Sequence, residues 1–259
     1  MNLSIPMDPL VMGGLVAARV GTFVMAVPIL GIRSVPAPVK IALSLWLAMV
    51  VATTLQPVGL PTGPGQLALG MLRESLVGLA MAFVVVLFFA AVQYAGQILG
   101  VQIGFAMVNV IDPQSQTNVS IVSQVYNLIA VLIFLAVDGP LILVRSIEES
   151  FFVIPPGAVH LSQQGIFEVA GAASVIFSLG FKIALPVIVT LLLVSLSMGI
   201  LGRTVPQLNI LVVGFPIKIM VGIFMISASI PFFADWVLGA LADLPQKMTG
   251  ALQAVGTGG

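Results

Sequence analysis

The chain has 259 residues, of which 59% are hydrophobic and only 7% are charged, where a soluble domain carries about a quarter. Together with a mean hydropathy of +1.21, this composition excludes an ordinary soluble fold and requires lipid or partner protein around much of the surface. Nine Lys and Arg balance nine Asp and Glu, with no long basic run, which disfavours binding to nucleic acid.

The N-terminus resembles no cleavable signal peptide. Residues Met1 to Pro9 contain Asp8 but no Lys or Arg, so the basic region that opens such a peptide is missing. We therefore expect the first apolar segment to remain in the mature protein.

Apolar runs long enough to cross a bilayer recur along the chain, and they are continuous rather than alternating, which favours helices over a barrel. We predict an all-α, membrane-associated protein with about six long hydrophobic helical segments. The last two segments are interrupted by Pro186, Pro216 and Pro231. The predicted spans are Leu10–Leu30, Ile41–Leu60, Ser75–Leu99, Val119–Val144, Val169–Ile200 and Pro206–Leu241.

Four charged residues lie inside or at the edge of these runs: Arg19, Asp138, Lys182 and Lys218. A charge in lipid is costly unless it is paired or hydrated. Arg19 is near the middle of its run, so we expect it to face protein or water. The two lysines fit either snorkelling from helix ends or partner contacts, and the distribution of Lys and Arg between the connecting segments gives no orientation.

Small residues recur at four-residue spacing. Gly96, Gly100 and Gly104 share one helix face, and Gly13-Gly14 with Ala17-Ala18 repeats the pattern in the first run. Small residues at this spacing let helices approach closely, which predicts a tight helix contact at the three aligned glycines.

Residues 104–119 are too polar after Asn109 to face lipid and too apolar before it for a flexible linker. Phe105, Met107 and Val108 are suited to a soft apolar stopper, because hydrophobic constrictions block ions by dewetting. Asp112-Pro113 indicates a turn. An ordinary loop between helices is the alternative.

Catalytic and metal chemistry have little support. The absence of cysteine removes thiol nucleophiles and thiolate metal sites, and the single histidine, His160, excludes any site that needs two imidazoles. No facing nucleophile and base are evident, so we expect neither an enzyme nor a cofactor or metal site.

The last two segments are predicted to form an antiparallel hairpin whose tip is Arg203 to Asn209. Thr204 is placed as the N-cap of the final helix and Pro206 in its first turn. The amides of Gln207 and Asn209 are positioned to bond either a neighbouring subunit or water.

Five motifs in this order resemble the flagellar biosynthesis protein FliR family and its injectisome counterparts in type III secretion. They span about 200 residues, so the resemblance covers most of the chain. The motifs are Val35-Pro36-Ala37-Pro38-Val39-Lys40-Ile41-Ala42-Leu43, Ala95-Gly96-Gln97 to Asp112-Pro113, Phe134 to Pro140 with Ser150-Phe151 and Ile154-Pro155, Phe181-Lys182-Ile183-Ala184-Leu185-Pro186, and Arg203-Thr204-Val205-Pro206-Gln207-Leu208-Asn209.

The resemblance implies a subunit of the protein export gate in the bacterial inner membrane, at the base of the flagellum. Such a subunit assembles with FliP and FliQ, and with the large gate protein FlhB, to pass unfolded protein substrates. The gate is expected to be raised toward the periplasm. Residues 1–164 are expected to be FliP-like, and residues 165–259 to be a FliQ-like hairpin.

Family likeness also gives roles to particular residues. The plug of the closed channel corresponds to Gly104, Phe105, Met107, Val108, Asn109, Asp112 and Pro113, and assembly contacts are expected at Arg203, Pro206, Gln207, Asn209, Lys182 and Lys218. Two alternatives stay open: a small-molecule secondary transporter with broken helices, and a structural assembly factor. The sequence does not distinguish a flagellar from an injectisome system.

Overall fold

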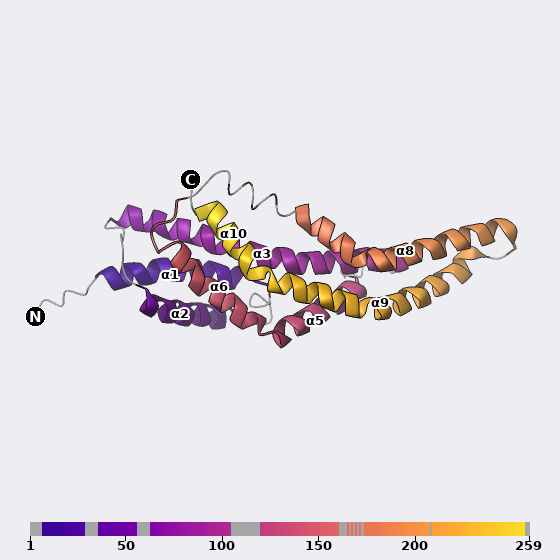
Figure 1. The fold of residues 1–259 in the computed structure, drawn as a ribbon, viewed down its shortest axis with the longest axis horizontal. Helices are drawn as coiled ribbons and strands as arrows, with labels where there is room; N and C mark the ends of the chain where they lie inside the picture. Colours follow the sequence, from indigo (N-terminus) through magenta and orange to yellow (C-terminus); the bar gives the residue numbers. More distant parts are fainter. Residues whose placement is uncertain are drawn as a thin grey trace, which may run out of the picture. The chain divides into compact units, whose positions relative to one another are not determined.

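The structure is a computed structural model, and it describes residues 7–28, 36–55, 63–104, 120–160, 165, 167, 169, 171, 174–207 and 209–256. The regular elements within these ranges are all helices, which confirms the predicted all-α class. In chain order (Figure 1) they are α1 (Met7–Ala26), α2 (Ala37–Thr54), α3 (Pro64–Ile103), α5 (Ile121–Ala136), α6 (Gly139–Val153), α8 (Ser174–Thr204), α9 (Ile210–Ala242) and α10 (Leu244–Gly256).

Five helices have the length and apolar composition needed to cross a membrane: α1, α2, α3, α8 and α9. A sixth span arises only if α5 and α6 are counted together as one broken crossing. The predicted set of long hydrophobic helices is therefore confirmed. Helix α3 is longer than expected, because its 40 residues begin at Pro64, ahead of the charged pair Arg73 and Glu74.

The segment predicted as the single span Val119–Val144 consists of two helices in the structure, α5 and α6, which are bent by 67° at the break between them. Asp138 lies between the two helices with a left-handed backbone, φ 55°. Pro140 follows in the first turn of α6. Backbone N–H groups in that turn have no partner within the helix, so proline, which lacks an N–H, is well tolerated there. The break is thus a consequence of the Asp138-Gly139-Pro140 sequence.

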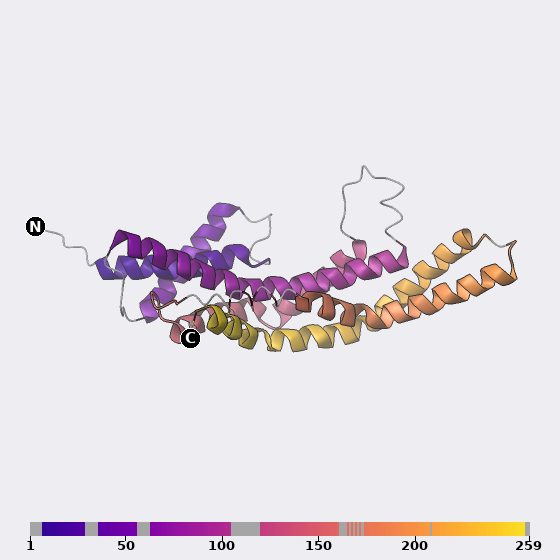
Figure 2. The same cartoon turned by 90° about the horizontal axis from the view of Figure 1, so that it is seen from above.

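Each of the two long C-terminal helices remains a single helix across its prolines. Helix α8 continues through Pro186, and α9 continues through Pro216 and Pro231. The predicted interruptions therefore do not divide these segments, as is common in membrane helices, where neighbouring groups satisfy the freed backbone carbonyls. The two helices lie side by side in both views of the chain (Figures 1 and 2).

The chain divides into two compact units. Unit 1 combines residues 1–87, 138–173 and 241–259, and unit 2 combines residues 88–137 and 174–240. Unit 1 thus contains α1, α2, the first part of α3, α6 and α10, while unit 2 contains the rest of α3, α5, α8 and most of α9. The predicted division at residue 164 concerns likeness to two other proteins, and it stays a prediction.

In unit 1 the core is built around α1, which packs against α2. Helix α2 buries only a narrow stripe and exposes large apolar side chains such as Trp46 and Met49 elsewhere. Its buried residues, Ser44, Ala48 and Val51, recur at helical spacing. The α1 residues with no exposed surface are Leu15, Val16, Val20 and Val24, and Val27, directly after the helix, is also fully buried.

Aromatic rings fill the core of unit 2. The Phe89 and Phe134 rings lie edge to face with centroids 6.0 Å apart, and the Tyr126 and Phe233 centroids are 4.7 Å apart. The Tyr126 hydroxyl shares a hydrogen bond of 3.3 Å with the Ser229 hydroxyl, which satisfies its polar end in an apolar setting. These pairs connect α3, α5 and α9.

Candidate functional site

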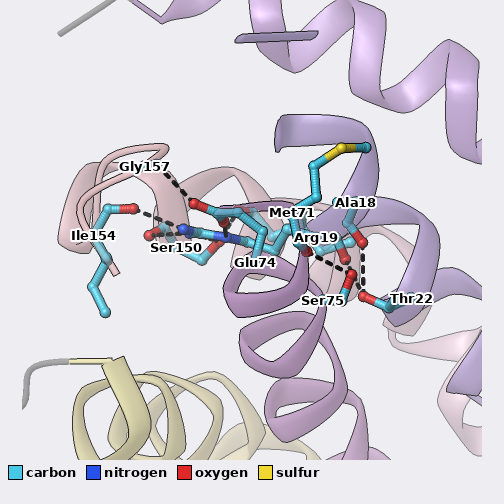
Figure 3. Close-up of polar contacts among 10 residues, drawn as sticks. Ala18, Arg19, Thr22, Met71, Glu74, Ser75, Ser150, Ile154 and Gly157 are labelled. Atoms are coloured by element: carbon cyan, nitrogen blue, oxygen red, sulfur yellow. Dashed lines mark hydrogen bonds and ion pairs between the residues drawn. The ribbon is translucent and has the colours of Figure 1, made fainter. Parts of the chain in front are cut away.

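The most polar part of the core lies in unit 1, where Arg19 on α1 meets Glu74 on α3 (Figure 3). The Arg19 Nε lies 2.6 Å from the Glu74 Oε2, and the two side chains are 1% and 0% exposed. Arg19 therefore faces protein, as predicted. Its partner was not predicted, because Glu74 directly precedes the apolar run that was taken as the third span.

The remaining donors of the guanidinium bond the C-terminal end of α6. Nη1 donates to the Ser150 carbonyl at 2.9 Å and to its hydroxyl at 3.2 Å, and Nη2 donates to the Ile154 carbonyl at 3.0 Å. The Ser150 carbonyl also accepts a helical hydrogen bond of 3.0 Å from the Ile154 N–H, and the carbonyl end of a helix attracts positive charge. The Phe151 ring completes this environment, with its centroid 4.2 Å from the Arg19 Cζ.

The second carboxylate oxygen of Glu74 accepts a hydrogen bond of 2.9 Å from the Gly157 N–H. Gly157 lies in a turn closed by the Ala158 N–H and the Pro155 carbonyl, 3.1 Å apart, and its φ is 85°. A proline followed by a glycine with positive φ is the sequence of a type II turn, here Pro156-Gly157. The turn thereby directs a backbone donor at the buried carboxylate.

Helices α1 and α3 approach each other closely beside this ion pair. A Cβ atom added to Gly78, one turn after Glu74, would collide with the Arg19 carbonyl and the Thr22 hydroxyl. The Thr22 hydroxyl donates to the carbonyls of Ala18 and Arg19 at 2.8 and 3.0 Å. We call Arg19, Glu74, Ser150, Ile154 and Gly157 the charge cluster. It joins α1, α3, α6 and the segment after α6 through groups that are paired with one another.

The predicted stripe of small residues in α1 does not make such a close approach. Nothing lies within 4 Å of a Cβ built on Gly13, and one built on Gly14 is in ordinary contact with Met71, 3.8 Å away. The small residue that admits the backbone of α1 is instead Gly78 of α3.

In unit 2, Gly96 and Gly100 lie where α3 meets the start of α5. A Cβ on Gly96 would collide with the Ser123 backbone, and one on Gly100 would collide with the Ser120 hydroxyl. The Ser120 N–H donates to the Gln97 side chain at 3.2 Å, and the Ser123 hydroxyl donates to the Gln93 carbonyl at 2.9 Å. The chain is therefore firmly held where α5 begins.

Of the residues predicted to form the plug, the structure describes Gly104. It follows the last residue of α3 with φ 107°, and its N–H bonds the Val101 carbonyl at 3.1 Å, which is a helix end suited to glycine. A Cβ there would lie 3.1 Å from the Phe215 ring. The other predicted plug residues, Phe105, Met107, Val108, Asn109, Asp112 and Pro113, lie outside the described residues.

The residues predicted to contact partners lie on the α8–α9 hairpin. Arg203, Pro206, Gln207 and Asn209 are exposed at its tip, Lys182 is exposed on α8, and Lys218 is half-buried on α9.

The prediction that Thr204 caps the final helix is wrong, because Thr204 is the last residue of α8 and its hydroxyl bonds the Ile200 and Leu201 carbonyls. Pro206 correspondingly lies in a turn before α9. Asn209 is the residue that caps α9, with its side-chain oxygen 3.4 Å from the Val212 N–H.

Comparison with known proteins gives a match over almost the whole of this helical framework. Residues 10–244 match the family model described as bacterial export proteins, family 1. The chain belongs to this family. The matched range includes all the described helices except the first residues of α1 and the part of α10 after Leu244.

Several curated relatives are similar to the chain over most of their length. The flagellar biosynthetic protein FliR of Escherichia coli K12 is 34% identical over 237 residues, which cover 89% of this chain and 91% of the relative. The protein of the same name from Bacillus subtilis is 34% identical over 216 residues, covering 82% and 83%. That of Pectobacterium carotovorum is 32% identical over 232 residues, covering 87% and 88%. The resemblance found in the sequence motifs is therefore confirmed.

Proposed function

We propose that this chain is a subunit of the type III protein export gate. With FliP and FliQ it forms the channel through which unfolded flagellar proteins leave the cytoplasm, in the inner membrane at the base of the flagellum. The observation that carries the proposal is the 34% identity to a flagellar biosynthetic protein FliR over 89% of this chain and 91% of that relative. The chain acts as a channel component and not as an enzyme.

The helix surfaces support a role inside an assembly. Only 28% of the apolar span in α8 and 17% of that in α9 are buried within the chain. The exposed remainder includes Phe224, Leu193 and Ile200, which are 58 to 70% exposed. Apolar surfaces of this extent mark contacts with lipid or protein, and FliP, FliQ and FlhB are the proposed protein partners.

We further propose that residues 104–119 contribute the plug of the closed channel. The contacts at both ends of this segment support the proposal, since α3 ends at Ile103, directly before Gly104, and the start of α5 is held against α3 by Gln97, Gly96 and Gly100. A segment that blocks a pore needs fixed ends, so that its apolar residues keep their position over the opening.

Replacing residues 105–119 by a short Gly-Ser linker is expected to leave the complex assembled but permeable to ions and small solutes, because the apolar stopper is gone. Membrane potential and solute uptake are measured in cells that carry the variant. The matched control replaces residues 56–62, between α2 and α3, by the same linker and should keep the membrane sealed. An intact seal in the plug variant would show that another segment closes the channel.

The hairpin tip is expected to contact partner subunits. Alanine at Arg203, Gln207 and Asn209 together should reduce recovery of the complex and export of flagellar proteins by several-fold, since exposed polar side chains at a tip are available for intersubunit hydrogen bonds. Alanine at Asp243 and Lys247, a similarly exposed pair, is the control. Unchanged assembly and export in the tip variant would exclude this contact.

A secondary transporter is the alternative function. It differs in one observable, because a transporter moves its solute as a purified chain in liposomes, whereas a gate subunit needs its partners.

A further inference from the structure

Helix α10 is an amphipathic helix that the sequence did not predict, and it begins at Leu244, the last residue matched by the family model. It packs against α6 in unit 1. The residues of its inner face recur at helical spacing, and each is at most 9% exposed. One buried apolar face gives the helix a single orientation on unit 1. That face consists of Leu244, Met248, Ala251, Leu252 and Val255.

The outer face of α10 carries no large apolar side chain. Gln246, Lys247 and Gly250 are exposed on it, and Asp243 stands exposed just before the helix. The Lys247 ammonium lies 3.7 Å from the Asp243 carboxylate, with the two side chains 54% and 64% exposed. An ion pair this exposed is stable in water but would be costly against hydrocarbon.

The outer face of α6 has the same character. Arg145 and Glu149 are exposed and Glu148 is partly exposed, within a helix of only 15 residues. Each charge at the centre of a bilayer costs about 2.5–3.5 kcal/mol on insertion scales. Leu141, Phe152 and Val153 are also exposed on α6, but they lie near its two ends, and a few exposed apolar side chains are common on water-facing surfaces.

Helix α5 cannot complete a crossing by itself. It has 16 residues, which at about 1.5 Å each span roughly 24 Å, less than the hydrocarbon core of about 30 Å. A crossing through α5 would therefore need the charged α6 as its second half.

We propose that α6 and α10 together form a water-facing layer over unit 1, so that the α5–α6 segment does not cross the membrane. The layer covers the charge cluster, because α6 supplies the Ser150 and Ile154 carbonyls that Arg19 bonds. Five helices then remain as candidate spans among the described residues. This inference is independent of the proposed function, since it depends only on helix length, charge and exposure in α5, α6 and α10.

The chain has no cysteine, so single cysteines report accessibility without background. Glu149→Cys and Gln246→Cys test the outer faces of α6 and α10. Met248→Cys, two residues along α10 on its inner face, and Met49→Cys, on the exposed apolar surface of α2, are the controls. Each variant is made in full-length chain in its native host, and membranes opened on both sides are treated with a membrane-impermeant maleimide.

We expect Glu149→Cys and Gln246→Cys to reach most of the labelling that they show after unfolding in SDS. Met248→Cys and Met49→Cys should stay nearly unlabelled until SDS is added. Protection of positions 149 and 246 in the opened membranes would overturn the proposal, because the layer would then be covered by lipid or by another subunit. Labelling of Met248→Cys equal to that of Gln246→Cys would also overturn it, since α10 would not be packed on α6.

Discussion

Glu74→Leu is expected to destabilise unit 1 by about 3–5 kcal/mol, the usual cost of removing one partner from a buried ion pair. Arg19 would remain as an uncompensated charge that is 1% exposed, and the Gly157 N–H would lose its acceptor. The guanidinium cannot turn to water, because its other nitrogens are bound to the α6 carbonyls of Ser150 and Ile154. The carboxylate is therefore the only counter-charge within the described cluster.

Replacing both charges, as Arg19→Leu with Glu74→Leu, should recover part of this loss, because no unpaired charge is left in the core. Glu149→Leu is the matched control, since it removes an exposed carboxylate and should change stability by less than about 0.5 kcal/mol. Unfolding is followed by SDS titration in mild detergent, using Trp46 of unit 1 as the reporter in a Trp236→Phe background. A Glu74→Leu chain that unfolds together with the Glu149→Leu control would contradict the role given to the cluster.

Gly96→Ala is the second change with a large expected effect, a loss of about 1–3 kcal/mol in unit 2. The added methyl group would collide with the Ser123 backbone, which cannot move aside as a flexible side chain can. Helices α3 and α5 must then separate, which strains the Gln97 contact that holds the start of α5.

Gly13→Ala, the same substitution in α1, is expected to raise stability where Gly96→Ala lowers it. Both glycines lie inside helices, but nothing lies within 4 Å of a Cβ at Gly13, so alanine should stabilise α1 by about 0.5–1 kcal/mol through helix propensity. Trp236, whose ring stacks on Phe88 with centroids 6.0 Å apart, reports Gly96→Ala in unit 2 in a Trp46→Phe background, and Trp46 reports Gly13→Ala in unit 1 in a Trp236→Phe background. If Gly96→Ala raised stability as Gly13→Ala does, the close approach of α3 and α5 would be refuted.

Hydropathy predicted the fold class and the long helices because burial in a nonpolar environment selects continuous apolar runs. It failed where other interactions decide the ends of helices. The division at Asp138 depends on backbone conformation and on Pro140, which leave the apolar content of the run unchanged. Helix α10 was missed because only one of its faces is apolar, so a search for uniformly apolar runs passes over it.

At the candidate sites too, the sequence indicated single residues but not the contacts that the fold creates between them. Arg19 was recognised because a charge in an apolar run needs an explanation, but its partner is 55 residues away and only the fold brings the two together. The cap of α9 could have been predicted from its sequence, since Asn209 precedes the helix directly and asparagine is a better cap than threonine. Thr204 instead bonds backward within α8, as a helical threonine often does.

The central claim, that this chain is a subunit of an export gate, is tested most directly by co-purification. The chain is tagged in its native host and extracted in mild detergent, and native mass spectrometry identifies and counts the proteins that accompany it. We expect one large complex with a single copy of this chain and several copies each of FliP and FliQ. A lone monomer or a symmetric homodimer would contradict the account.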